Sequence, residues 1–447
     1  MTLGAKPAIG YAFPEALLAP VKAISGYRRL WVALSGGLDS TLLLHLAALC
    51  HSGVRAVHIN HQLQANAGDT EVFCQELCAG LGIPLTVQPV SVKLGAGPGE
   101  GLEEAARKAR YSVFETLLEP DDVLLMAHHG DDQAETVLFR MFRGSGVAGL
   151  AGMPEARPLG QGRLARPLLG VERSELELHA RQAGLSWVDD PSNTDQKFDR
   201  NFIRISILPA LKKRWPGLNQ RLRHSAGACS ESDFLNKRLA ELQWQSLGGH
   251  KRRVPVAGLG ALTLAEQKNL LRWWVRQAGY DVPSKSDWSQ VLHDLLQAAE
   301  DRSPELRAGN YSLRRFQGEI YLVPDTADLP EEPVTLQPGQ PVQWGEWTIR
   351  LTPAAFTAKA DTPPIRICTR QGGERMRFYA GGQSKSLKKW LQEQAVPPWE
   401  RLRLPLIFRG VEPEEELIAI GDLWCSEQYC GKAPAAGLQL IVERDCD

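Results

Sequence analysis

The sequence Ser35-Gly36-Gly37-Leu38-Asp39-Ser40 lies between an apolar run at 30–34 and a helical pattern that begins at Thr41. This order predicts a strand, a glycine-rich turn and a helix. Two glycines allow a tight turn and let a ligand approach the backbone closely. The backbone N–H groups and the Ser35 and Ser40 hydroxyls would then face an anion at a helix N terminus, where the helix dipole favours negative charge. The carboxylate of Asp39 suits a Mg²⁺ ion between it and phosphate groups.

This turn is not a Walker loop, because the sequence G-x-x-x-x-G-K-S/T does not occur in the chain. It resembles the PP-loop of the ATP-pyrophosphatase superfamily. That resemblance implies an enzyme that splits ATP into AMP and pyrophosphate to activate a carbonyl oxygen. The alternative interpretation is an ordinary Ser/Gly turn that caps a helix.

Strand-like runs alternate with helical patterns over the first 130 residues. This alternation predicts a parallel sheet with helices on both faces, and ligands of such sheets bind at the carboxyl ends of the strands. The strands are expected at 30–34, 54–59, 85–88 and 123–126, and the helices at 69–81, 102–118 and 131–142. We expect an α/β N-terminal domain with a doubly wound, mainly parallel sheet at 1–216, a mainly helical middle domain at 217–330, and a small α+β C-terminal domain at 331–447.

Composition and charge limit the classes of function that are compatible with this sequence. The 447 residues carry a net charge of −1, but basic residues dominate 197–253 and 366–409, which favours a polyanion partner. The alternative is solvated surface charge. The eight cysteines include no C-x-x-C pair, which predicts reduced thiols rather than a metal cluster or a disulfide framework. No run of some 18 apolar residues and no secretory signal are visible, so we expect a cytoplasmic protein without a membrane span.

An acidic cluster follows the strand expected at 123–126. Asp132 and Glu135 are spaced i, i+3 on a helix and lie beside Asp131, so these carboxylates can grip an ammonium group such as a lysine side chain. His128 and His129 precede them. A hydrogen-bonded loop pair and a His/Asp metal site are the alternative interpretations of the two histidines.

Three helices carry basic candidates for anion binding. Arg107 shares nearby surface of one helix with Glu103 and Tyr111, at spacing i, i+4, i+8, which also fits a solvated, salt-bridged face. Arg200 and Arg204 are four apart and can present guanidinium groups to phosphates, although a turn with an N-cap explains this segment too. The third set, on a helix expected at 384–394, shares one face and consists of Lys385, Lys388 and Lys389.

An ordered series of motifs resembles the tRNA(Ile)-lysidine synthetase family. Over about residues 29–215 the motifs are SGGLDS, VHINHQL, EEAARKARY, AHHGDDQAET, RGSG, RPLL and DDPSNTDQKFDRNFIR. Residues 370–375, 385–393 and 397–401 resemble the C-terminal domain of the longer, enterobacterial-type members. Gln62 departs from the family, which often has Gly after this histidine.

The resemblance implies a reaction and its participants. ATP adenylates the 2-carbonyl oxygen of the wobble cytidine in an isoleucine tRNA with a CAU anticodon, and the ε-amine of free L-lysine then displaces AMP. No membrane and no stable protein partner are implied. The ATP-binding residues would be Ser35, Gly36, Gly37, Leu38, Asp39, Ser40, His58 and Arg107, with Asp39 on Mg²⁺. The lysine-binding residues would be Asp131, Asp132 and Glu135. The catalytic residues would be Asp39, Arg107, Asp132 and Glu135. The tRNA-binding residues would be Arg200, Arg204, Lys385, Lys388 and Lys389.

Three other functions remain open at this point. A tRNA thiolase of the same superfamily would need a sulfur-carrying cysteine near the site, and the N-terminal candidates are Cys50, Cys74 and Cys78. An amidating synthetase would need a glutaminase domain or partner, and no cysteine occupies position 2. A catalytically inactive RNA-binding adaptor would not need the intact SGGLDS sequence.

Overall fold

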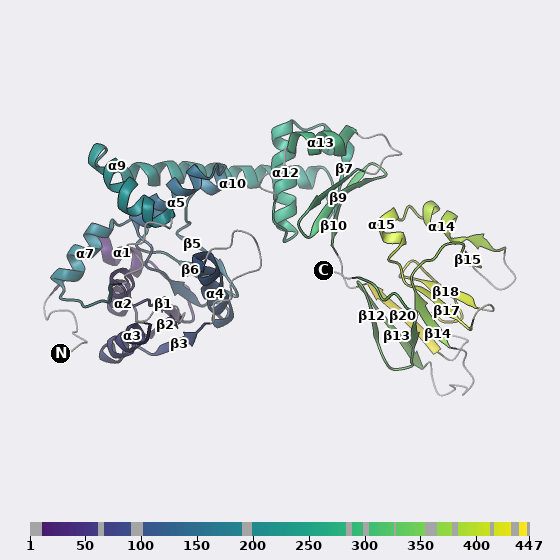
Figure 1. The fold of residues 1–447 in the computed structure, drawn as a ribbon, viewed down its shortest axis with the longest axis horizontal. Coiled ribbons are helices and arrows are strands. Elements are labelled where there is room, and N and C mark those ends of the chain that lie inside the picture. Colours follow the sequence, from purple (N-terminus) through teal and green to yellow (C-terminus); the bar gives the residue numbers. More distant parts are fainter. Residues whose placement is uncertain are drawn as a thin grey trace. The chain divides into compact units, whose positions relative to one another are not determined.

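A computed structural model of the 447-residue chain shows two compact units, Met1–Asn236 and Lys237–Asp447 (Figure 1). The structure describes residues 11–60, 67–90, 102–189, 199–282, 288–297, 304–325, 328–353, 364–377, 383–411, 415–430 and 438–444. None of the helices in these ranges has the length and apolar character that a membrane crossing requires.

The first unit is built on a six-stranded sheet in the order β3-β2-β1-β4-β6-β5. Its strands are β1 (Leu30–Ala33), β2 (Val54–Asn60), β3 (Leu85–Pro89), β4 (Val123–Leu125), β5 (Ala156–Leu159) and β6 (Gly162–Ala165). All neighbours pair in parallel except β5, which returns antiparallel to β6. The predicted mainly parallel sheet is therefore confirmed.

Helices cover both faces of this sheet. They are α1 (Glu15–Lys22), α2 (Leu38–Cys50), α3 (Ala67–Leu81), α4 (Leu102–Leu117), α5 (Gly130–Phe142), α6 (Val147–Leu150) and α7 (Arg173–Gln182). Alternate residues of β1 enter different cores, because successive side chains of a strand point to opposite faces. Leu30 and Val32 join the core with α1, α2 and α7, whereas Trp31 joins the core with Phe114 of α4. The doubly wound arrangement follows from these two cores.

A helical segment follows the sheet. It consists of α8 (Asp199–Phe202), the π-helix η2 (Ile203–Ile207), α9 (Leu208–Arg214) and α10 (Leu218–Ser246). Ile203 and Leu208 pack against Ala134 and Leu138 of α5, so this segment lies directly over the acidic helix. Helix α10 is 29 residues long.

The second unit begins with a four-stranded antiparallel sheet and three short helices. The strands are β7 (Arg253–Pro255), β8 (Glu305–Ala308), β9 (Tyr311–Phe316) and β10 (Glu319–Pro324), in the order β7-β10-β9-β8. The helices are α11 (Val256–Gly260), α12 (Leu264–Gln277) and α13 (Trp288–Gln297). Strands β9 and β10 form a hairpin around Gln317-Gly318, and Thr263 and Glu266 form the capping box of α12.

The rest of the second unit is β-rich. A five-stranded sheet in the order β11-β14-β17-β18-β19 lies beside a three-stranded sheet in the order β12-β13-β20. The elements are β11 (Val334–Leu336), β12 (Val342–Trp344), β13 (Trp347–Pro353), β14 (Ile365–Cys368), β15 (Arg375–Met376), β16 (Lys385–Ser386), α14 (Leu387–Glu393), α15 (Pro398–Arg401), β17 (Leu406–Arg409), β18 (Glu416–Ile420), β19 (Trp424–Cys425) and β20 (Leu438–Arg444). Trp399 of α15 packs on Phe316 and Tyr321 of the β9–β10 hairpin, with ring centroids 6.0 and 5.5 Å apart.

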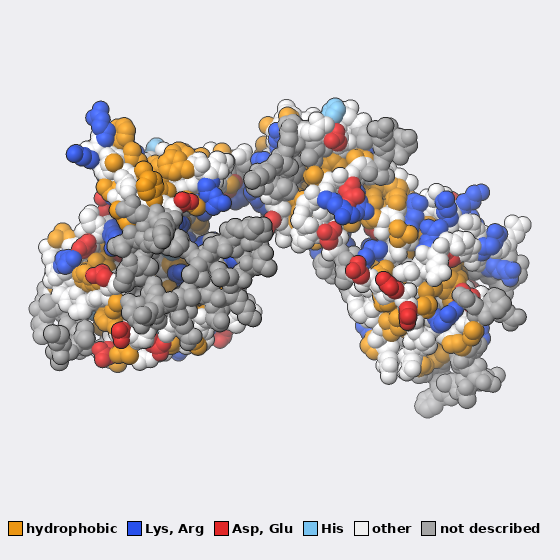
Figure 2. All heavy atoms as spheres, in the orientation of Figure 1, with side chains coloured by type: hydrophobic (Ala, Val, Ile, Leu, Met, Phe, Trp, Pro, Cys, Tyr) orange, Lys and Arg blue, Asp and Glu red, His pale blue; other side chains and the backbone are white. Residues whose placement is uncertain are grey.

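The basic helix of the C-terminal part is shorter than predicted. Lys385 belongs to β16, which pairs with β15, and it forms an ion pair with Glu393. The predicted helical face shared by Lys385, Lys388 and Lys389 is therefore wrong for Lys385. Lys388 and Lys389 are exposed on α14, while Trp390 is buried beneath them. Figure 2 shows Lys and Arg side chains gathered over the region of α14 and β15.

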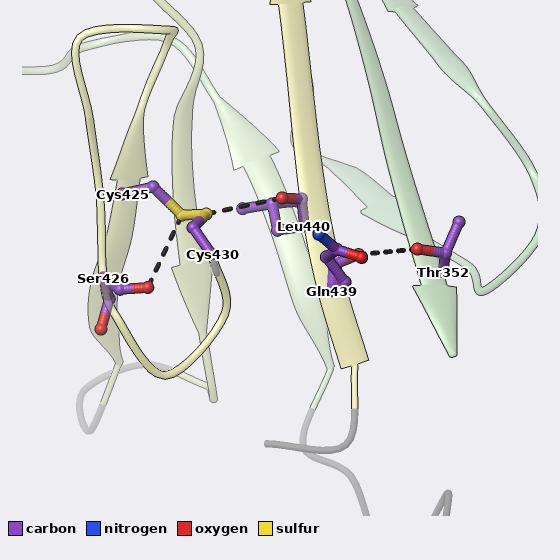
Figure 3. Close-up of a disulfide and its surroundings, with 6 residues drawn as sticks. All are labelled: Thr352, Cys425, Ser426, Cys430, Gln439 and Leu440. Carbon is purple, nitrogen blue, oxygen red and sulfur yellow. Dashed lines mark hydrogen bonds between the residues drawn. A yellow bond between two sulfur atoms is a disulfide. The ribbon is translucent and has the colours of Figure 1, made fainter. Parts of the chain in front are cut away.

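One disulfide corrects the prediction that the cysteines are all reduced. Cys425 at the end of β19 is bonded to Cys430, with their Cα atoms 6.0 Å apart (Figure 3). The Cys430 sulfur also lies 3.4 Å from the carbonyl oxygen of Leu440 in β20. Five cysteines are free in the described residues: Cys50, Cys74, Cys78, Cys229 and Cys368.

Candidate active site

The glycine-rich turn connects β1 to α2 as the sequence predicts. Gly36 has φ +83°, and a Cβ atom there would lie 2.9 Å from Thr70 Cγ2, so this position requires glycine. Ser40 is buried and donates its hydroxyl proton to the carbonyl oxygen of Gly37, which fixes the turn internally. Ser35 is exposed. Gly37 has no side chain to cap the 13-residue helix α2, so the N–H groups of its first turn are available to an anion.

Asp39 has the properties of a magnesium ligand. Its Oδ1 atom is buried and has no hydrogen-bond partner, and its Oδ2 atom lies 3.6 Å from Nε2 of His129. A carboxylate oxygen that no protein group satisfies, beside a helix N terminus, fits a cation shared with phosphate oxygens. In the described part of the chain, no group of three or more His, Cys, Asp or Glu residues could hold a metal by itself.

His129 joins the turn after β1 to the acidic helix after β4. Nε2 of His129 lies 3.6 Å from Asp39 Oδ2 and 3.4 Å from Asp132 Oδ2, and His129 and Asp132 form the capping box of α5. Desolvation lowers the pKa of His129, but the hydrogen bond to Asp39 and the charges of Asp132, Asp39 and Asp131 outweigh it, so the pKa is raised. Because β1 and β4 are adjacent, the predicted ATP and lysine sites are neighbours.

The carboxylates of the acidic helix are held by cations of the chain itself. Arg204 Nε donates to Glu135 Oε1 at 2.6 Å, and Arg204 Nη2 donates to Glu135 Oε2 at 2.9 Å and to Asp132 Oδ1 at 3.1 Å. Glu135 is only 3% exposed, and this burial raises its pKa although Arg204 opposes the shift. Asp131 pairs with Lys212 and accepts the backbone N–H of Arg173 at 2.9 Å.

This arrangement affects the lysine-binding role predicted for Asp132 and Glu135 and the phosphate-binding role predicted for Arg204. In this conformation the Arg204 guanidinium binds the two carboxylates that were predicted to bind the lysine ammonium. It does not extend outward to a phosphate. The partner of Arg204 could not be read from the sequence, because Glu135 lies 69 residues upstream. The π-helix η2 that carries Arg204 gives one clue, since such local irregularities occur frequently at functional sites.

His58 and Cys74 lie behind the glycine-rich turn. His58 is buried at the end of β2, where its Nδ1 lies 2.9 Å from the carbonyl oxygen of Leu34 and 3.6 Å from Cys74 Sγ. Burial raises the pKa of Cys74 to about 12 and that of Cys78 to about 11, so both remain thiols at neutral pH. A thiol that cannot ionise is a poor sulfur nucleophile, which argues against the thiolase interpretation.

The remaining predicted residues are distributed over both units. Arg107 lies on α4 with its guanidinium carbon 5.4 Å from the centre of the Tyr111 ring, and the Glu103 side chain lies outside the described residues. Arg200 donates to Thr136 of the acidic helix at 3.3 Å. Lys385, Lys388 and Lys389 belong to the second unit.

The sheet, the glycine-rich turn and the adjacent carboxylates define the first unit as a PP-loop domain. Residues 13–211 match the family model described as PP-loop domain. Residues 255–321 match the TilS substrate binding domain, and residues 365–442 match the TilS substrate C-terminal domain.

Whole-chain relatives identify the family. The chain is 39% identical over 434 residues to the tRNA(Ile)-lysidine synthase of Pseudomonas fluorescens, which covers 92% of each protein. It is 37% identical over 422 residues to that of Serratia proteamaculans, which covers 92% of this chain and 94% of the relative. The chain therefore belongs to the tRNA(Ile)-lysidine synthase family, and it is an enzyme of the ligase class.

One solved structure is a distant match to the first part of the chain. The U34-tRNA thiolase NcsA from Methanococcus maripaludis is 20% identical, with a TM-score of 0.40, over 48% of this chain and 79% of that chain. This likeness is too distant for a conclusion about function.

Proposed function

We propose that this enzyme joins lysine to C2 of the wobble cytidine in an isoleucine tRNA with a CAU anticodon, consuming ATP. One observation carries the proposal: His129 connects the PP-loop carboxylate of Asp39, at 3.6 Å, to Asp132 of the carboxylate pair, at 3.4 Å. A site for an anionic phosphate chain thus adjoins a site for an ammonium group. Ligation of lysine at the expense of ATP requires this combination.

The proposed chemistry has two steps. The 2-carbonyl oxygen of cytidine attacks the α-phosphorus of ATP, and pyrophosphate leaves. The neutral ε-amine of lysine then attacks C2, the C–O bond to AMP breaks, and a base takes the surplus amine proton. Adenylation is needed because an unmodified carbonyl oxygen is a poor leaving group. Asp39 would hold a Mg²⁺ ion, which would supply positive charge to the phosphate oxygens.

Residues of the first unit have distinct roles in this proposal. The exposed Ser35 and the N–H groups of Gly36–Ser40 bind the phosphates, and His58 supports the turn from behind. Arg107 contacts both an ATP phosphate and the reacting base. Asp132 and Glu135 hold the lysine ammonium, with Asp131 beside them, after the guanidinium of Arg204 has moved away. A guanidinium released in this way is free to contact tRNA phosphate.

The second unit extends the tRNA contact in this proposal. Lys388 and Lys389 are exposed on α14 and offer two positive charges to the RNA backbone, and Arg200 adds a contact from the first unit. We also propose three domains, at residues 1–216, 217–330 and 331–447. ATP, lysine and tRNA are cytoplasmic substrates, so we propose that the enzyme acts in the cytoplasm.

Mass spectrometry tests the reaction directly. The purified enzyme is incubated with ATP, Mg²⁺, lysine and the unmodified tRNA transcript, and the tRNA is then digested to nucleosides. A lysine-sized mass gain on one cytidine, together with equal amounts of AMP and pyrophosphate, is expected. Release of pyrophosphate without that mass gain would refute lysine transfer, and a sulfur-sized gain would instead indicate a thiolase.

A further inference from the structure

A buried arginine lies at the carboxyl end of β6, one strand beyond the acidic helix. Arg166 directly follows β6 and is 5% exposed. Its Nε donates to Nδ1 of His128 at 3.2 Å, and its Nη1 donates to the carbonyl oxygen of Pro154 at 2.8 Å. Desolvation lowers the pKa of His128 to about 4, so this histidine is a neutral acceptor and adds no counter-charge.

Further arginines surround Tyr111 beside it. Tyr111 lies beside Arg166 and influences its pKa, and the Tyr111 hydroxyl donates to Sδ of Met126 at 3.7 Å. The ring of Tyr111 lies 5.1 Å from the guanidinium carbon of Arg157 and 5.4 Å from that of Arg107. Guanidinium groups stack readily on aromatic faces, and the stacking holds them in fixed orientations.

Arg140 of α5 and Arg200 of α8 are the remaining members of this arginine group. Arg140 of α5 donates to the carbonyl oxygens of Gly149 and Gly152, at 2.9 and 2.7 Å, and Arg200 of α8 donates to Thr136. Burial lowers the pKa of Arg140, and the charges of Arg200, Arg107 and Arg166 lower it further, so these guanidinium groups lie close enough to repel one another.

The partners described for Arg140, Arg157, Arg166 and Arg200 are carbonyl oxygens, hydroxyl groups, a histidine and a ring. Within the described residues, none of these contacts is to a carboxylate. Like charges gathered at partly buried positions cost free energy unless an anion neutralises them. Fixed guanidinium forks suit phosphate oxygens. The group is therefore prepared for an anionic ligand.

The position of the group favours one kind of phosphate. Strands β1, β4 and β6 are consecutive neighbours in the sheet. Because neighbouring strands are about 4.8 Å apart, the carboxyl end of β6 lies roughly 10 Å from the PP-loop after β1. The phosphates of ATP belong at the PP-loop, so the arginines face a second anion at the other side of the reacting site.

We propose that Arg157 and Arg166 beside Tyr111, together with Arg140 and Arg200 of the neighbouring helices, bind a backbone phosphate of the RNA next to the reacting nucleotide. The inference rests on the proposed function in that RNA is the substrate. Phosphate contacts of this kind position the nucleic acid and make its affinity dependent on salt.

Variants of Arg157 test the site, since Arg157 is half-buried in β5 and its loss leaves the buried Arg166 in place. The probe is an unmodified isoleucine tRNA transcript, and its affinity is measured by fluorescence anisotropy at several KCl concentrations. Arg157→Ala should weaken binding at least fivefold and make the slope of log affinity against log salt shallower by about 0.7. Arg157→Lys should fall between Arg157→Ala and the unchanged protein, because it keeps the charge and loses the planar stack.

Arg163→Ala is the matched control. Arg163 lies in the same hairpin, toward the opposite end of β6, and its exposed guanidinium bonds the carbonyl oxygen of Ser25. This control should bind tRNA within twofold of the unchanged protein and keep its salt slope. Melting temperatures of all variants verify that they are folded.

Two outcomes overturn the site. One is a folded Arg157→Ala protein with unchanged tRNA affinity and salt slope. The other is a loss of ATP affinity with tRNA affinity intact, which would assign the arginines to ATP. Lysine transfer by the unchanged protein is measured separately. If that protein binds tRNA through Arg157 but adds no lysine, the proposed function fails while the phosphate site stands.

Discussion

The ion pair between Arg204 and Glu135 gives the most direct test of the acidic site. Arg204→Ala leaves the Glu135 carboxylate, which is 3% exposed, without its bidentate partner. The loss of folding stability at pH 7 cannot exceed the free energy of protonating Glu135, because the buried carboxylate can take up a proton instead of remaining charged. Raising a carboxyl pKa from about 4.3 to 7 costs about 3.7 kcal/mol. Since the Arg204 side chain is 30% exposed, partial solvation reduces the expected destabilisation to about 2–3 kcal/mol.

A double-mutant cycle separates the pair from its surroundings. The free energy of unfolding is measured by urea denaturation for Arg204→Ala, Glu135→Gln and the double variant. We expect a coupling of at least 1 kcal/mol, because Glu135→Gln removes the charge that Arg204 neutralises. Arg181→Ala is the control. It breaks an exposed pair with Glu177 and should cost less than about 1 kcal/mol.

The pH dependence sharpens this test. In Arg204→Ala the folded-state pKa of Glu135 rises further above its unfolded value, so the folded variant binds more protons than the unfolded chain. Its stability should therefore recover as the pH falls from 7 to 5, and the gap to the unchanged protein should narrow. A coupling below about 0.5 kcal/mol, or a gap that is equal at both pH values, would refute the buried pair.

Lysine links this pair to function. If free lysine binds Asp132 and Glu135, it should stabilise Arg204→Ala more than the unchanged protein, in which the guanidinium competes. At 100 times its dissociation constant, a ligand adds about 2.7 kcal/mol. Norleucine lacks the ε-amine and should add little. Equal stabilisation by norleucine would show that the two carboxylates do not bind the ε-ammonium group.

Three further predictions concern other parts of the chain. Asp39→Asn should nearly abolish pyrophosphate release at saturating Mg²⁺ without lowering the melting temperature, and near-normal turnover would remove Asp39 from the metal site. Burial lowers the pKa of His45 to about 4, so as the pH falls below 6.5 the unfolded chain binds this proton before the folded protein does. The free energy of unfolding of the first unit, measured by calorimetry, should therefore fall by about 2 kcal/mol between pH 7 and 5. His45→Gln should abolish this loss. Replacing Lys388 and Lys389 together by alanine should weaken tRNA binding and reduce the salt slope by up to about 0.7 per lysine, with ATP affinity unchanged; an unchanged slope would mean that this face is only solvated.

Local patterns in the sequence were sufficient to predict strands β1 to β4 of the first sheet, but not β5 and β6. Strands β1 to β4 and their helices have clear periodicity, and the glycine-rich turn has a defined backbone requirement at Gly36. The carboxyl ends of adjacent parallel strands must meet at one edge, so the proximity of Asp39 and Asp132 could also be inferred. These predictions depend on residues close together in the chain.

Contacts between distant segments could not be predicted in this way. Arg204 meets Glu135 only because η2 packs over α5. Lys385 lies inside the helix expected at 384–394, yet it pairs in a strand with Met376, nine residues earlier. Cys425 and Cys430 lack the C-x-x-C spacing, but the turn after β19 brings them together. In each case tertiary structure overrides a local signal.

The order of charged groups along the sheet edge has a physical consequence for the proposed reaction. ATP phosphates at β1 and an RNA phosphate at β6 would lie about 10 Å apart, where each pair of unit charges repels by roughly 1.7 kcal/mol at an effective dielectric constant of 20. Cations on both sides offset this repulsion, but Asp131, Asp132 and Glu135 between them would add to it. Arg204 and Lys212 offset two of these three negative charges in the structure, which in the proposed function lets both polyanions bind before lysine does. When the lysine ammonium replaces the Arg204 guanidinium, the charge between the two phosphate sites stays the same. In the proposed function this exchange would place an amine beside the activated cytidine without weakening the binding of either polyanion.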